Sequence, residues 1–467
     1  MRQKTLLAPT IALILSGCVV GPNYKPPIAE LPAKYSEAKD KSAENVRLNP
    51  WWERFKDKRL NALVAEGMNE NLSVLGSLER IVEAQANVVA AGAGALPQVN
   101  GSAGAIINGE NSTNAKHTTN KTASAGLTAS WLLDFFGQYK RSTEAANYSL
   151  DAAYDNVNVA RLAYFSDLAV TYVDLRYYQE SLALTRENLA SRRVTLKLIN
   201  DIKEAGSASR LDVVQAEGLV NQTLAEIPTL ETGYHLAANH IATLLAVPAA
   251  TMTASFARGS GQPMPRNATK TGIPADLIRN RPDIRQAERL LAASTASIGV
   301  AESQLYPSIS LGGSIDGSRF STRVGSGGLL SWSFGPTVVV PIFNGGALKA
   351  EVDIANSVAR QQYIAWKQVV LNAIEEVEDA QIALHRDYQT VYALRRLVVS
   401  YEEALSLARE SYKGGTATVL DILDAERNVA NGRLTLATSI RNLARDYIAL
   451  NVAIGGGSDI GSPIKTQ

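Results

Sequence analysis

The feature that most constrains this chain is an internal duplication. The stretch EAGSASRLDVVQAE (204–217) returns as KGGTATVLDILDAE (413–426), and in this alignment Asp212 matches Asp421. Two further pairs of segments recur at nearly the same offset, namely ANVVAAGAGALPQV with ASIGVAESQLYPSI, and DFFGQYK with PIFNGGALK. A nearly constant offset across such distant landmarks indicates two copies of one domain rather than an array of short repeats.

The two copies are predicted to share one plan, in which a strand pair is followed by two long helices. The first copy covers 52–250 and the second 273–455, with a linker rich in Pro, Gly, Ser and Thr at 251–272 and a tail at 456–467. The expected strands are at about 97–108, 121–134, 307–317 and 329–343, and the expected helices are at 137–203, 209–246, 346–412 and 417–454.

The predicted strands alternate apolar residues with small or polar ones. In 330–342, for example, Leu, Trp, Phe, Val and Ile alternate mostly with Ser, Gly and Thr. This alternation is typical of strands that face lipid on one side and water on the other, although a half-buried soluble sheet gives the same pattern. The polar segments 108–120 and 316–328 are expected to be long hairpin loops.

The predicted long helices exceed what a globular domain needs. Residues 137–203 and 346–412 contain no proline, so each can form one helix of about 100 Å at ~1.5 Å per residue. Ile422, Val429 and Leu436 recur at every seventh position, which is a coiled-coil spacing. These helices therefore predict a rod or a tube.

The N-terminus has the features of a secretory signal. Basic residues precede an apolar run (6–15) and small residues, so 1–17 is predicted to be a signal peptide. Cys18, the only cysteine, follows Leu-Ser-Gly as in a bacterial lipobox. That resemblance implies cleavage before Cys18, a covalent lipid on it and a lipidated tail at 18–51; an ordinary signal with a chance cysteine is the alternative. No later segment is apolar over ~18 residues, so no transmembrane helix is expected.

Composition argues against several other functions. A net charge of +1 gives no general attraction to nucleic acid, so no nucleic-acid partner is expected. A single cysteine rules out an intramolecular disulfide, and His235 and His240 lack the i, i+4 spacing of a helical metal pair. No GxSxG, HExxH or P-loop motif is present. We therefore expect no enzyme, no metal site and no cofactor other than the lipid on Cys18.

The number of strands makes a prediction about assembly. The smallest bacterial barrels use about eight strands, and open sheet edges are not tolerated in lipid. If the four predicted strands span a membrane, several copies of the chain must pool them.

The lipobox, the two halves and the repeated motif together resemble the TolC-like outer-membrane efflux proteins, in the lipoprotein branch that serves resistance-nodulation-division (RND) pumps. The stretches that carry this resemblance are NPWWERFKDKRLNALV (49–64), IPADLIRNRPDIRQAE (273–288) and YKGGTATVLDILDAE (412–426).

The resemblance implies a mainly α fold, in which a long coiled-coil α-helical barrel continues a transmembrane β-barrel of twelve strands, four from each protomer of a homotrimer. It implies a place in the cell outer membrane, in contact with outer-membrane lipid, a periplasmic adaptor protein and an inner-membrane RND pump. The function would be a passive exit duct for drugs or other small toxic compounds. A type I protein-secretion duct and a structural periplasmic coiled-coil lipoprotein with a soluble sheet are the alternatives.

The repeated motif is predicted to turn one long helix back into the next. Glycine tolerates the positive φ that such turns need, and the hydroxyls of Ser207 and Thr416, or of Ser209 and Thr418, can cap the following helix. The predicted hairpin tips and adaptor contacts are Gly206, Ser207, Leu211, Gly415, Thr416 and Leu420.

Only the second copy carries a second acid in this motif. Asp421 and Asp424 are spaced i, i+3 on one helix face, whereas Gln215 stands at the position of Asp424 in the first copy. In a trimer the two acids would form carboxylate rings that favour cations, and the resemblance places the periplasmic gate there. It also implies that Asp212 hydrogen-bonds Tyr412 in the closed state. A solvated helix start is the alternative for the two acids.

Overall fold

The computed structural model describes residues 19–36, 46–112, 115–259, 261–265, 274–322 and 325–461. The predicted signal peptide and Cys18 lie outside the described residues. The chain divides into two compact units. Unit 1 comprises Met1–Ile28, Arg80–Ala153 and Gln286–Lys367, and unit 2 comprises Ala29–Glu79, Tyr154–Arg285 and Gln368–Gln467.

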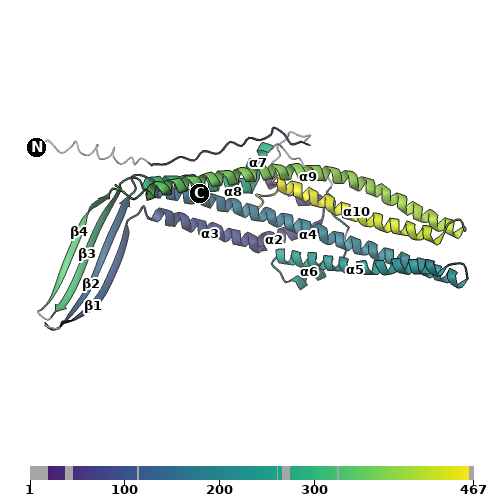
Figure 1. Cartoon of the computed structure of the whole chain (residues 1–467), viewed down its shortest axis with the longest axis horizontal. Helices are drawn as coiled ribbons and strands as arrows, with labels where there is room; N and C mark the ends of the chain where they lie inside the picture. Colours follow the sequence, from purple (N-terminus) through teal and green to yellow (C-terminus); the bar gives the residue numbers. More distant parts are fainter. Residues whose placement is uncertain are drawn as a thin grey trace. The chain divides into compact units, whose positions relative to one another are not determined.

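Unit 1 contains a four-stranded antiparallel sheet. Its strands β1, β2, β3 and β4 lie in that order, so a strand of the first copy pairs with a strand of the second at the centre of the sheet (Figure 1). The strands are β1 (Gln98–Ser112), β2 (Ala115–Leu133), β3 (Ser308–Thr322) and β4 (Gly325–Val339).

The register gives this sheet two different faces. Leu127 lies opposite Ile315, which lies opposite Trp332, and all three side chains are exposed (54%, 47% and 78%). On the other face Ser314 and Ser333 are opposite each other, with their hydroxyls 3.1 Å apart. Because directly paired residues share a face, the sheet carries an exposed apolar face and an exposed polar face.

The predicted hairpin loops at 108–120 and 316–328 are wrong. Strand pairing continues through most of both segments, since Asn108 pairs with Asn120 and Phe320 with Gly327. Backbone ladders do not require apolar side chains, so polar residues extend the strands beyond the alternating pattern. At its other end β4 stops at Val339, which pairs with Ser308, the first residue of β3. The next residue of β4 would face Pro307, which has no N–H to donate.

The helices repeat the same lengths in both copies. Helices α4 (Gln138–Glu204) and α9 (Ala347–Lys413) have 67 residues each, and α5 (Arg210–Leu244) and α10 (Val419–Ala453) have 35 each. All four begin and end within two residues of the predicted bounds. The remaining helices are η1 (Val46–Leu48), η2 (Trp51–Phe55), α2 (Lys58–Glu70), α3 (Leu72–Ala93), α6 (Ala249–Ser255), α7 (Pro274–Asn280) and α8 (Pro282–Ser303).

Aromatic residues of η2 anchor the N-terminal segment in the core of unit 2. Trp51 is fully buried, and its indole N–H donates to the carbonyl of Gly456 at 3.1 Å. The ring of Trp52 lies 4.7 Å from that of Phe165. Among the described residues no single helix has the length and hydropathy needed to cross a membrane; α5 and α6, bent by 118°, meet that test only as a broken pair.

Candidate functional site at the hairpin tips

Each long helix ends in the same backbone motif. Gly206 after α4 and Gly415 after α9 have φ values of +80° and +72°. The N–H of Ser207 donates to the carbonyl of Ile202 at 3.0 Å, and that of Thr416 donates equivalently to Ser411 at 3.0 Å. This is the Schellman arrangement, which satisfies carbonyls at the helix end and reverses the chain. The two glycines thus have the turn geometry that the sequence predicts.

The next helix in each copy begins with a capping box. Ser209 caps α5 and Thr418 caps α10, each accepting from the backbone N–H of the aspartate three residues on. One carboxylate oxygen of Asp212 accepts from the N–H of Ser209 at 2.8 Å, and one of Asp421 accepts from the N–H of Thr418 at 2.7 Å. Of the two hydroxyl pairs considered, Ser209 and Thr418 therefore act as caps.

These caps also fix the charge of the two aspartates. Backbone and side-chain hydrogen bonds from Ser209 hold the pKa of Asp212 below its usual value, and Thr418 does the same for Asp421. Hydrogen bonds to a carboxylate favour its charged form. Both carboxylates are exposed to solvent, so each tip carries an ionised acid at neutral pH.

Asp424 has a partner that sequence reasoning missed. The guanidinium of Arg427 lies 2.7 Å from the carboxylate of Asp424, and both side chains are about half exposed. The i, i+3 spacing was the available signal, because such residues are neighbours on a helix. Gly218 stands at the position of Arg427 in the first copy. The second tip therefore carries an acid and a base that the first tip lacks.

Asp212 and Tyr412 are not hydrogen-bonded within the described part of one chain. The carboxylate of Asp212 bonds to Ser209, and Tyr412 packs against an apolar cluster. The hydrogen bond between Asp212 and Tyr412 in the closed state stays a prediction.

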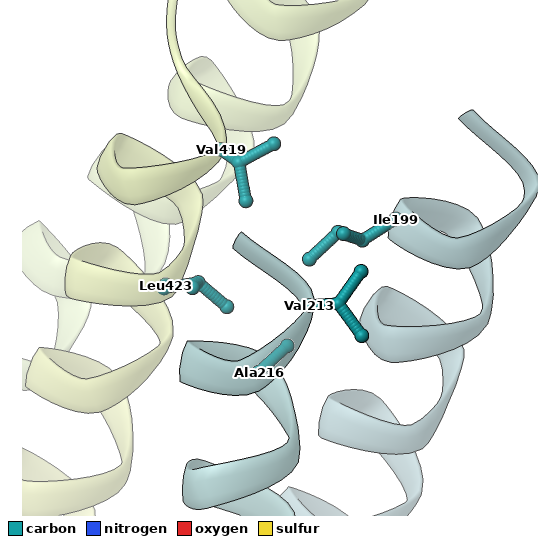
Figure 2. Close-up of a cluster of buried hydrophobic side chains, with 5 residues drawn as sticks. All are labelled: Ile199, Val213, Ala216, Val419 and Leu423. Atoms are coloured by element: carbon teal, nitrogen blue, oxygen red, sulfur yellow. The ribbon is translucent and has the colours of Figure 1, made fainter. Parts of the chain in front are cut away.

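That apolar cluster joins the two hairpins. Figure 2 shows side chains from α4, α5 and α10 directed toward one another. By contrast, Leu211 and Leu420 are 65% and 51% exposed at the two tips. The buried members are Ile199, Val213, Ala216, Val419 and Leu423.

Further along α9 and α10, two acids lie together. Burial and the neighbouring carboxylate of Asp387, which shares a hydrogen bond with it, raise the pKa of Asp446 to about 7. Like charges at close range disfavour double ionisation, so the pair holds a proton at mildly acidic pH.

Comparison with known proteins places this architecture in a family. The sequence profile of the outer membrane efflux protein family matches residues 68–247 and 273–456, which correspond to the two copies. The chain belongs to this family. It is 49% identical to nodulation protein T of Rhizobium leguminosarum bv. viciae over 458 residues, which is 98% of this chain and 94% of that protein.

Two other relatives extend the comparison. The cation efflux system protein CusC of Escherichia coli (strain K12) is 29% identical, with 98% of this chain and 100% of CusC covered. The solved structure of the outer-membrane channel OprN is similar with a TM-score of 0.84 at 29% identity, and covers 94% of this chain and all of OprN. This outer membrane efflux protein is thus an outer-membrane channel of a tripartite efflux system with a TolC-like fold. Its relatives are channels rather than enzymes.

Proposed function

We propose that three copies of this outer membrane efflux protein form one passive exit duct. The observation that carries this proposal is the two-faced sheet, in which β1 and β4 each pair on one side only among the described strands. Four strands are too few for a closed barrel, whereas twelve from three protomers suffice. The apolar face would contact lipid and the polar face would line the water-filled passage.

A lipid on Cys18 fits the base of this sheet. The N–H of Val20 donates to the carbonyl of Phe136 at 3.2 Å, three residues after β2 ends. A lipid attached two residues before Val20 would therefore lie where the strands end, in the adjacent leaflet. Mass spectrometry of the purified protein tests whether Cys18 carries the lipid, with Cys18→Ser as the control.

The hairpin tips would form the periplasmic gate. In a trimer Asp421, ionised and held by its cap, would form one carboxylate ring, and Asp424 would form a second ring that Arg427 partly neutralises. Rings of carboxylates favour cations over anions. Asp421 should consequently contribute more to selectivity than Asp424.

Reversal potentials of the purified trimer in a planar bilayer test the gate. Asp421→Asn with Asp424→Asn should raise the permeability of chloride relative to potassium. Glu217→Gln removes an exposed carboxylate from α5 and is the matched control. Equal selectivity in all three proteins would contradict the assignment of the gate.

A periplasmic adaptor and an inner-membrane RND pump would complete the system. Exposed Leu211 and Leu420 at the tips give the adaptor an apolar surface to cover. One relative is named for a nodulation function and another for cation efflux. We propose small toxic compounds or drugs as the cargo here. A deletion strain tested against dyes, antibiotics and metal salts, with and without the gene restored, would identify them; unchanged sensitivity throughout would contradict this cargo.

A further inference from the structure

A buried carboxylate ties the two hairpins together above the tips. Glu426 of α10 is only 3% exposed. One of its oxygens accepts from the hydroxyl of Thr195 at 2.7 Å and from that of Ser191 at 3.1 Å, both on α4. The same oxygen accepts from the guanidinium of Arg409 of α9 at 2.8 Å. These four residues, named the Glu426 node, therefore join three helices.

Only the second copy contributes a buried glutamate of this kind. Its counterpart in the first copy, Glu217, is 41% exposed and lies 3.6 Å from Arg210 of its own helix. Asn200 stands where the second copy has Arg409, and Ala404 stands where the first copy has Thr195. A helical hairpin of this type thus forms without a buried glutamate. Because α4 belongs to the first hairpin and Glu426 to the second, the node serves contact between the hairpins.

Glu426, Ser191 and Arg409 line a groove, and a second, more exposed bridge between the hairpins lies in it. The groove has a volume of about 520 Å³ and includes Arg433, which donates to Glu187 of α4 and to Glu402 of α9, each at 2.8 Å. The side chains of Glu187 and Glu402 are 63% and 41% exposed. Exposed pairs are screened by water and salt, whereas a buried carboxylate that loses its partners is left unsatisfied. The buried node is therefore the stronger restraint.

The partners of Glu426 divide according to the hairpin that they belong to. Arg409 is on α9, in the same hairpin as Glu426, and would stay beside it if that hairpin moved. Within the node, only the bonds that Ser191 and Thr195 of α4 donate to Glu426, and the bond from Arg409 to Ser191 at 2.8 Å, would break. Movement would thus leave no unpaired charge.

Even when the node is formed, one oxygen of Glu426 lacks a hydrogen bond to the described residues. It is the other carboxylate oxygen, and it is buried. Water reaching that oxygen would offset part of the loss of the bonds to α4. The arrangement is therefore suited to a contact that opens and closes rather than to a permanent one.

We propose that the Glu426 node is the latch that holds the second hairpin against the first when the duct is closed, with Glu426 as its positioning residue. This inference rests on the proposed gate, because Glu426 lies five residues after Asp421 on α10. The latch sets how often the second hairpin moves away, and the acids at the tip set which ions pass.

The test is single-channel recording of the purified trimer. Glu426→Gln and Thr195→Val should each raise the ratio of open to closed time by about tenfold, as expected for loss of a hydrogen bond to a buried charge. Chloride-to-potassium permeability should stay unchanged. Glu217→Gln, the same substitution at the matching position, should leave the open time unchanged.

The outcomes separate the latch from the gate. Unaltered open times in Glu426→Gln and Thr195→Val would overturn the latch, as would an equal effect of Glu217→Gln. If Asp421→Asn with Asp424→Asn keeps the wild-type chloride-to-potassium permeability, the gate is overturned instead. Migration of unboiled samples shows whether each variant still assembles.

A cross-linking experiment keeps the latch testable if Glu426→Gln does not assemble. Ser191→Cys and Arg409→Cys place thiols on α4 and α9 at positions that an arginine side chain spans. A bifunctional thiol-reactive cross-linker of about that length should hold the duct closed, and a reductant that cleaves its disulfide bonds should restore opening. Openings of the cross-linked trimer as frequent as before treatment would overturn the latch. Each single-cysteine variant controls for reaction elsewhere.

Discussion

Arg141 in unit 1 permits a prediction about how the N-terminal tail is held. Its side chain is almost fully buried, with the residue 3% exposed. The guanidinium donates to the carbonyls of Val20 and Gly21, each at 3.0 Å, and to the side chain of Asn23 at 2.9 Å. A fourth bond goes to Glu144 at 2.7 Å. We expect Arg141→Ala to release the tail without unfolding the sheet.

The size of the effect follows from these contacts. Three of the bonds go to the tail, and hydrogen bonds from a charged donor contribute about 1.5–3 kcal/mol each, although they are not additive. The bond from the N–H of Val20 to Phe136 remains in the variant. We therefore expect the free energy of local opening to fall by ~3 kcal/mol, which corresponds to roughly 150-fold faster exchange.

Hydrogen exchange at the amide of Val20 measures this directly, because that amide is bonded in the folded state. The same peptide should be protected in Arg427→Ala, which removes an exposed arginine from α10. Arg141→Lys should give an intermediate rate, since an ammonium cannot reproduce the forked geometry. Unchanged exchange at Val20, or equal acceleration in β2, would refute the reasoning.

Two further predictions concern thermal stability. Gly415→Ala should lower the free energy of unfolding by about 1–2 kcal/mol, because the φ of +72° is unfavourable for alanine even though there is space for its methyl group. Gly218→Ala, inside α5, should be neutral or stabilising, because alanine favours the helix. A lower melting temperature for Gly218→Ala would contradict this. The native state holds a proton on Asp446 more tightly than the unfolded chain, so the contribution of Asp446 to stability is full below about pH 4 and is lost as the pH rises toward 7. Calorimetry should show this slope in the wild type and a flatter one in Asp446→Asn, and identical slopes would rule out Asp446 as its cause.

Much of this fold could be predicted from the sequence because it rests on period and repetition. The long proline-free stretches gave helix bounds close to those of α4 and α9. The motif around Gly206 and Gly415 predicted the turns, since few other residues tolerate a positive φ. Family membership followed from the same repeated features.

Other features could not be predicted because they depend on contacts between helices. Glu217 and Glu426 occupy matching places in nearly identical motifs, yet one is exposed and the other is buried. The difference comes from Arg409 and Thr195 on other helices, which no local pattern reveals. The strand ends were missed for a related reason, because pairing with a neighbour rather than apolar alternation extended them.

The sheet of unit 1 affects how a newly made chain behaves before it assembles. Among the described strands, β1 and β4 each present a row of N–H and C=O groups that no other strand pairs, and β4 adds exposed Trp332 and Phe334 beside them. Such edges pair readily with any similar strand, so an unassembled chain is prone to aggregate. The rate of productive assembly depends on the concentration of partners, whereas time in the periplasm favours wrong pairing. Export, delivery to the membrane and assembly must therefore keep pace with one another, and a chaperone that covers β1 and β4 would relax that demand.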